Sequence, residues 1–126
     1  MSRLLLLSLF AALIWSAPAS ADPCEAIPEH GPLPRYLAFG AGFSGSVSHV
    51  IDGDSLCVAV GPGPPDWVEV RLADFYAPEL RRLGGAAAKS ALARLALGQH
   101  AECVANLRTY DRIAARCRIH AARSAT

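Results

Sequence analysis

Residues 55–79 read SLCVAVGPGPPDWVEVRLADFYAPE, and this stretch decides the fold. Apolar side chains recur at every second position over residues 56–60 and again over residues 67–72. That period is typical of β-strands with one buried face. The Gly and Pro run between them, residues 61–66, indicates a stiff loop that joins the two strands into a hairpin.

Three further strands are predicted on either side of this hairpin. Residues 43–50 are strand-like and end at the Asp52-Gly53 turn, so the first three strands form a meander. Residues 100–105 and 112–119 are predicted as the last two strands, and a turn joins them. The chain therefore supplies five strands in two groups.

A single helix is predicted over residues 86–97, between the third and fourth strands. Its Ala, Leu, Lys and Arg content favours a helix, and Gly98 is suited to end it. One face of this helix can be shared by Ala88, Ala91, Leu92 and Leu95. Three strands, a helix and two strands are the order of the oligonucleotide-binding (OB) barrel. We therefore expect an α+β fold, mainly β, with a five-stranded OB-type barrel and one helix between strands 3 and 4.

The first residues have the pattern of an export signal. Arg3 precedes a mostly apolar run from Leu4 to Trp15, and the small residues Ala19-Ser20-Ala21 form a cleavage site before Asp22. The run is roughly a dozen residues long, whereas a membrane span needs about 20. We predict a signal peptide over residues 1–21, a secreted or periplasmic protein, and no stable membrane association after its removal. An uncleaved helix in the membrane interface is the alternative.

Removal of the signal leaves 126 − 21 = 105 residues, enough for one small domain. Residues 22–41, which contain four prolines, predict an irregular N-terminal arm, and residues 42–126 the barrel domain. Residues 22–80 hold 2 basic and 9 acidic side chains, whereas residues 81–126 hold 9 basic and 2 acidic ones. A carboxylate-rich half and a basic half suit a metal site beside an anion-binding face.

The four cysteines fit an oxidising compartment, because they are even in number and show no Cys-x-x-Cys metal spacing. Strand alternation directs Cys57 away from the barrel interior, where the arm with Cys24 can reach it. Cys103 and Cys117 lie on the last two strands, nearly symmetric about Tyr110. We therefore predict the disulfides Cys24–Cys57 and Cys103–Cys117.

Three ordered motifs carry further information. Residues 47–55 read VSHVIDGDS, residues 71–79 read RLADFYAPE, and residues 108–112 read RTYDR, with Gly84-Gly85 before the predicted helix. In this order and spacing the motifs resemble those of the staphylococcal nuclease-like (thermonuclease) family, over about residues 43–119. The resemblance implies a calcium-dependent phosphodiesterase with DNA or RNA as its substrate. No protein partner is predicted.

The resemblance assigns catalytic roles to three residues. Glu79 matches the general base that polarises a water molecule, and Arg71 and Arg112 match the two arginines that grip the phosphate. Tyr110 matches a tyrosine beside the bound nucleotide. Taken singly, the same residues have structural explanations: an acidic side chain behind a proline at a helix start, solvated strand arginines, and a packed hairpin tyrosine.

The metal site implied by the resemblance is incomplete in this chain. Asp54 matches a metal-ligating carboxylate, and the backbone carbonyl of Ala77 a second ligand for Ca²⁺. Tyr76, however, stands where the family has another carboxylate, so we expect a weakened calcium site. Arg108 and Asp111 also depart from the D-R-Y-G-R motif, because they replace its first aspartate and its glycine.

Three functional hypotheses remain open from the sequence. The first is an exported nuclease, the second an inactive relative that binds nucleic acid or another anion without cutting, and the third a disulfide-stapled structural module. The chain ends at Thr126, a few residues after the last predicted strand, so we also expect the family's C-terminal helices to be missing. A barrel without closing helices should be only marginally stable and should depend on its disulfides.

Overall fold

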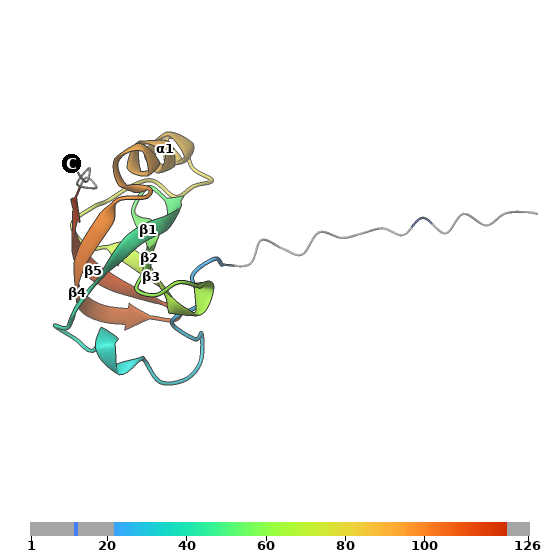
Figure 1. The fold of residues 1–126 in the computed structure, drawn as a ribbon. Coiled ribbons are helices and arrows are strands. Elements are labelled where there is room, and N and C mark those ends of the chain that lie inside the picture. Colours follow the sequence, from blue (N-terminus) through green and yellow to red (C-terminus); the bar gives the residue numbers. More distant parts are fainter. Residues whose placement is uncertain (1–11, 13–21, 121–126) are drawn as a thin grey trace, which may run out of the picture.

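The computed structural model describes residue 12 and residues 22–120. The predicted signal peptide lies outside the described residues apart from Ala12, and so does the chain after His120. The elements follow in the order η1 (Arg35–Leu37, a 3₁₀ turn), β1 (Gly42–Asp52), β2 (Ser55–Ala59), η2 (Pro64–Asp66, a second 3₁₀ turn), β3 (Trp67–Leu72), α1 (Gly85–Ala96), β4 (His100–Thr109) and β5 (Arg112–His120). Figure 1 shows these elements along the chain.

The five strands form a closed barrel in the order β1-β2-β3-β5-β4. Closure depends on β1, which pairs with β4 through its first half and with β2 through its second half. Gly45 lies where β1 changes partner, and a Cβ atom there would collide with the backbone carbonyl of Ala59. β3 and β5 are the one parallel pair among the described strands, and the segment through α1 and β4 supplies the long connection that parallel strands need. The predicted fold class, an OB-type α+β barrel, is confirmed.

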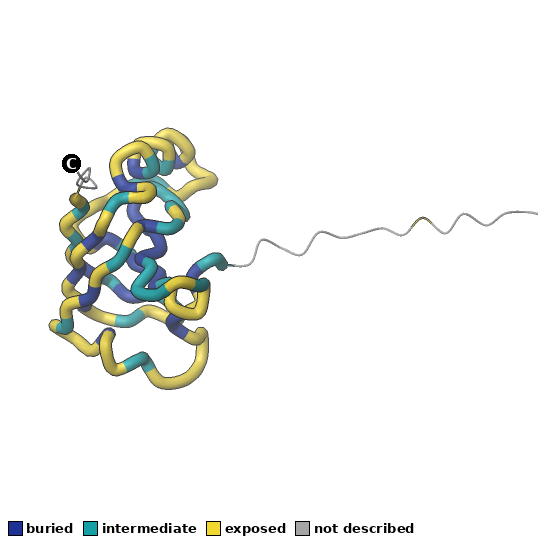
Figure 2. Tube along the Cα trace, in the orientation of Figure 1, coloured by how far each residue is buried: buried dark blue, intermediate teal, exposed yellow. Residues whose placement is uncertain are grey.

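The barrel interior is filled by small and branched side chains. Val58, Val68, Val70 and Ile113 are 0% exposed, and Figure 2 shows buried positions alternating with exposed ones along the strands. α1 lies across one end of the barrel, and η1 lies at the other (Figure 1). No helix among the described residues is both long enough and apolar enough to cross a bilayer.

The face of α1 that packs on the barrel differs from the predicted one. Gly85, Leu92 and Ala96 are buried, whereas Leu95 is 72% exposed. Helical periodicity permits both stripes, because Ala and Leu are spread around this helix. The end of the helix agrees with the prediction, since Gly98 adopts a left-handed φ of 77° immediately after the last turn.

Both predicted disulfides are confirmed. Cys24 in the arm is bonded to Cys57 on β2 with a Cα–Cα distance of 5.6 Å, and Cys103 on β4 is bonded to Cys117 on β5 at 4.1 Å. The arm also bonds to the loop before β3 and to its first residue: the N–H groups of Glu25 and Ala26 donate to the carbonyls of Pro64 and Trp67. The arm therefore covers Cys57 on the outer face of β2 and lies against the start of β3, and Cys57 is 0% exposed although it points away from the core.

Candidate functional site

The tight turn between β1 and β2 is held together by Asp52. Its Oδ1 accepts hydrogen bonds from Ser55 Oγ at 2.6 Å and from the backbone N–H of Asp54 at 3.1 Å. Burial raises the pKa of Asp52, but these hydrogen bonds outweigh burial and the pKa is lowered. Asp52 therefore has a structural role. It holds the turn in a shape that leaves the side chain of Asp54 beside Arg71 on β3.

Gly53 allows this turn to contact two other parts of the chain. A Cβ atom at Gly53 would lie 2.6 Å from the Cβ atoms of both Ala77 and Ala88. Ala77 belongs to the segment after β3, and Ala88 lies on α1. The absence of a side chain at Gly53 thus brings the acidic turn, the Ala77-Pro78-Glu79 segment and the helix into direct contact.

Asp54 and Arg71 form an ion pair at the centre of this contact. Arg71 Nη2 lies 3.2 Å from Asp54 Oδ2, and the backbone N–H of Ala77 also donates to the Asp54 carboxylate. Burial and the neighbouring carboxylate of Asp52 raise the pKa of Asp54, and Arg71 and Ala77 offset part of that rise. Asp54, Arg71 and Ala77, which are separate in sequence, are therefore brought together as the motifs predict.

Glu79 lies on the exposed loop that follows, residues 73–84. The carbonyl of Glu79 accepts a hydrogen bond from the N–H of Arg82 at 2.8 Å, and Gly85 packs against the same carbonyl. Its backbone is thereby fixed at the start of α1 while its carboxylate is exposed. Tyr76, on the same loop, is 90% exposed.

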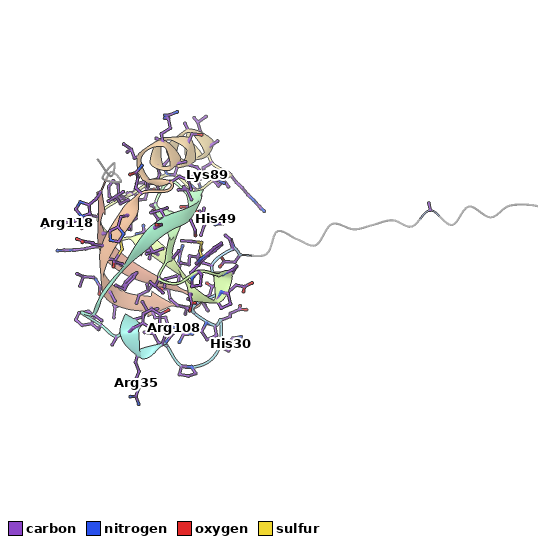
Figure 3. The ribbon with its side chains drawn as sticks, in the orientation of Figure 1. His30, Arg35, His49, Lys89, Arg108 and Arg118 are labelled. Carbon is purple, nitrogen blue, oxygen red and sulfur yellow. A yellow bond between two sulfur atoms is a disulfide. The ribbon has the colours of Figure 1, made fainter. Side chains whose placement is uncertain are left out.

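Arg112 and Tyr110 line a separate hollow beside this group. The hollow has a volume of about 730 Å³ and is also lined by Asp22, Glu69, Asp111, His49 and Lys89, among others. Lys89 comes from α1 and His49 from β1, and Figure 3 shows both side chains on the same side of the barrel. We call this hollow the arm pocket, because the arm contributes Asp22 and Pro23 to its wall.

Three carboxylates crowd together in the arm pocket. The carboxylate oxygens of Asp22, Glu69 and Asp111 all lie within 4.8 Å of one another. Glu69 is only 8% exposed. Burial raises its pKa, the charges of Asp22 and Asp111 raise it further, and the result is a pKa of about 7. Burial also raises the pKa of Asp22. The sequence analysis did not identify this cluster, because Glu69 occupies an outward position on β3 that alternation predicts to be solvated.

The Asp54–Arg71 pair and the arm pocket lie next to each other on the outer surface of the barrel. The register of β3 and β5 pairs Val70 with Ile113 and Arg71 with Ala114, so Arg112 lies level with Glu69. Arg71 is therefore offset from Arg112 by two residues, about 6.6 Å along the strands. The structure thus places the two arginines on neighbouring strands, and their binding to one phosphate group stays a prediction.

Arg108, which stands where the D-R-Y-G-R motif has its first aspartate, has a structural role in this chain. Its guanidinium donates to three backbone carbonyls, those of Tyr110 at 2.7 Å, Gly31 at 2.6 Å and Pro28 at 2.5 Å. Tyr110 has a φ of 55°, the one positive φ among the described non-glycine residues. Arg108 thus ties the β4–β5 turn, which carries Tyr110 and Arg112, to the N-terminal arm; Figure 3 shows Arg108 and His30 at the same end of the barrel.

The groups around Asp54 do not fit a full calcium site. Calcium takes about six to eight oxygen ligands and more than one carboxylate. Asp54 is already paired with Arg71, and Tyr76 is solvent-exposed. Asp74, the nearest alternative in sequence, lies 3.5 Å from Arg116 and is exposed. Among the described residues, Asp54 belongs to no group of three potential metal ligands. A weakened calcium site stays a prediction.

Comparison with protein-family models finds none that matches the chain, and comparison with curated proteins finds no relative.

Proposed function

We propose that the surface around Asp54, Arg71 and Glu79 binds and hydrolyses phosphodiester bonds of single-stranded DNA or RNA. The observation that carries the proposal is the convergence of three sequence motifs on one surface. The Asp54–Arg71 pair contacts the Ala77-Pro78-Glu79 segment, and Arg112 lies on the adjacent strand. These residues offer a carboxylate open to solvent and two planar cations, which is the set that phosphoryl transfer to water requires.

In the proposed reaction, Arg71 and Arg112 bind the non-bridging oxygens of the scissile phosphate. Glu79 accepts a proton from a water molecule, whose oxygen then forms a bond to phosphorus. The bond from phosphorus to the leaving oxygen breaks, and that oxygen takes a proton from solvent. Charge that develops on the phosphate oxygens is stabilised by the two guanidinium groups. Calcium binding is expected to be weak, and no step above depends on it.

The charges in the arm pocket argue against a catalytic role for Arg112. They favour a second function, in which the chain binds anions without cleaving them. Arg112 faces Glu69, Asp22 and Asp111, so its positive charge is partly neutralised before any ligand arrives. A phosphodiester, which carries one negative charge, would meet net repulsion there while the carboxylates are ionised. Under this alternative, nucleic acid would bind through Arg71, and Glu79 would have no catalytic role.

Export of the protein is part of the proposal. Two disulfides among the described residues support an oxidising compartment, and the small-residue site before Asp22 supports signal cleavage. N-terminal sequencing of the protein recovered from the medium or periplasm of an expressing bacterium tests this point.

The deciding experiment is incubation of the purified chain with end-labelled single-stranded DNA. Three conditions are compared: calcium, magnesium, and a chelator alone. We expect cleavage that disappears in the Glu79→Gln variant, and the comparison of the three conditions measures how far that cleavage depends on the metal ion. A matched control is Glu29→Gln, which removes an exposed carboxylate from the arm and should leave cleavage unchanged. Binding of the DNA without cleavage under all three conditions would support the second function instead.

A further inference from the structure

Among the residues that the structure describes, none forms an ion pair with the carboxylate cluster of the arm pocket. Its members come from three parts of the chain: Asp22 from the arm, Glu69 from β3 and Asp111 from the β4–β5 turn. Among residues 22–120, no lysine, arginine or histidine nitrogen forms an ion pair with any of them. Arg112 acts on Glu69 only through its charge. Like charges at this separation repel one another, and the repulsion increases as the pocket excludes water.

Glu69 is the member whose position requires a partner. It is more than nine-tenths buried and contributes to the wall of the arm pocket. The arm holds it there, because Cys57, bonded to Cys24, is the cross-strand neighbour of Glu69. The carboxyl group of Glu69 shares a hydrogen bond with that of Asp22, so the pair needs either a proton or a nearby cation between its oxygens. The hollow in front of Glu69 therefore has space and charge suited to a small cation.

A cation of this kind would be created by cleavage at the predicted signal site. Cleavage after Ala21 leaves Asp22 with a free α-ammonium group. Covalent geometry holds the backbone nitrogen of Asp22 within about 5 Å of its own carboxylate oxygens. Those oxygens lie within 4.8 Å of the oxygens of Glu69 and Asp111. The new charge would thus form beside the cluster.

We propose that the cluster of Asp22, Glu69 and Asp111 is a binding site for the chain's own amino terminus, which cleavage after Ala21 creates. The ammonium group binds between the carboxylates of Glu69 and Asp111 and fixes the start of the arm against β3. Export and folding are thereby linked, because the cleaved chain gains a charge pair that the uncleaved chain lacks. The inference rests on the predicted processing and is independent of nuclease activity.

The pH dependence of this effect follows from the two groups that titrate. A free α-amino group has a pKa of about 7.7 to 8.0, and nearby carboxylates raise it in the folded state. Its stabilising effect is present from the pH at which the carboxylates ionise up to that range, and it is lost as the pH rises through the raised folded pKa of the amine. Ammonium binding also lowers the pKa of Glu69 from about 7. The other charged or titratable groups facing the pocket are Asp22, Asp111, Arg112, Lys89, His49 and Tyr110.

Three forms of the chain from Asp22 to Thr126 test the proposal. The first has a free Asp22 amine, the second is Nα-acetylated, and the third retains Ala21 so that the amine moves by one residue. The Glu69 side-chain carboxyl is followed by NMR between pH 4 and pH 9, and thermal unfolding is measured at pH 7. We expect the Glu69 pKa to be lower by about one unit or more in the free form. We also expect the free form to unfold at the highest temperature.

A double variant provides the control. In Glu69→Gln combined with Asp111→Asn, acetylation should no longer change the unfolding temperature. Equal Glu69 titration in the free and acetylated forms would overturn the proposal. A calcium or magnesium effect on Glu69 that is as strong in the free form as in the acetylated form would also overturn it, because the cluster would then hold an external cation. Sequencing of the exported protein separates the two premises: a mature N-terminus other than Asp22 removes the biological role, whatever the nuclease assays show.

Discussion

Two carboxylates of this barrel, Asp54 and Glu69, are equally buried, at 8% exposure each, yet their surroundings differ. Asp54 lies 3.2 Å from a guanidinium group of Arg71 and accepts a backbone hydrogen bond from Ala77. Glu69, two residues before Arg71 on the same strand, faces two other carboxylates, and its pKa rises to about 7. Burial raises the pKa of both groups, but Arg71 offsets part of the rise at Asp54, whereas two further carboxylates add to the rise at Glu69.

The largest expected effect is on turnover, and it distinguishes the surface around Glu79 from the arm pocket around Glu69. Glu79→Gln should lower the turnover of single-stranded DNA by on the order of 10² or more, because general base catalysis contributes about that much. Glu69→Gln should leave turnover within about threefold, because Glu69 lies below the arm. Both variants are measured at saturating substrate, with unfolding temperatures checked first. An equal loss of turnover in the two variants would show that the reaction also needs the arm pocket.

The two disulfides should differ slightly in how much they stabilise the folded chain. Chain-entropy estimates give about 3.7 kcal/mol for a bridge that closes 33 residues and about 3.0 kcal/mol for one that closes 14. Replacement of Cys24 and Cys57 by alanine should therefore reduce the free energy of unfolding slightly more than the same replacement of Cys103 and Cys117. Urea denaturation of both double variants measures this.

The same two double variants also test what raises the pKa of Glu69. Loss of the Cys24–Cys57 bond frees the arm that covers Glu69, so the pKa of Glu69 should fall towards 4.5. Loss of Cys103–Cys117 should leave the Glu69 pKa unchanged. A shift of equal size in the two variants would mean that the arm is not what raises this pKa.

Removal of the Glu69 charge should stabilise the uncleaved chain above neutral pH. An ionisable acid whose pKa is about 7 in the folded state and 4.5 in the unfolded state loses stability as the pH rises from 4.5 to 7. Glu69→Gln should therefore increase the free energy of unfolding at pH 8 by on the order of 1 to 3 kcal/mol, with little change at pH 4. Glu102→Gln, an exposed carboxylate on β4, is the control.

Calcium should have the smallest effect. Asp54 is the carboxylate predicted to bind calcium, and it is already paired with Arg71. We expect calorimetry to show binding weaker than micromolar, and no change in Asp74→Asn, because Asp74 faces Arg116. Submicromolar binding that disappears in Asp74→Asn would show that the loop after β3 rearranges to complete a calcium site.

The barrel and its disulfides could be predicted because they depend on local alternation. Alternation over residues 56–60 and 67–72 directs the valines inward, and the same parity places Cys57 under the arm. The buried face of α1 was predicted less well, since Leu95 is exposed and Ala96 is buried. An alanine-rich helix has no sharp apolar stripe, so the direction of packing depends on how the helix crosses the barrel.

The arm pocket could not be predicted from the motifs, because its acidic cluster joins three distant segments. One signal was present in the sequence. The predicted bond of Cys57 to Cys24 implied that the arm covers the outer face of β2, and Glu69 is the cross-strand neighbour of Cys57. A covered carboxylate was therefore foreseeable at Glu69, whereas the approach of Asp111 depends on the turn that Arg108 ties to the arm.

The central claim, that phosphate binds on the outer face of β3 and β5, can be tested by NMR without any cleavage. The Glu79→Gln variant is titrated with a short single-stranded oligodeoxynucleotide while the guanidinium Nε–H signals of all arginines are followed. We predict that the Arg71 and Arg112 signals shift together and saturate at one affinity, whereas those of Arg94 on α1 and Arg118 on β5 stay in place. Shifts confined to Arg116 and Arg118, at the other end of β5, would contradict the proposed site.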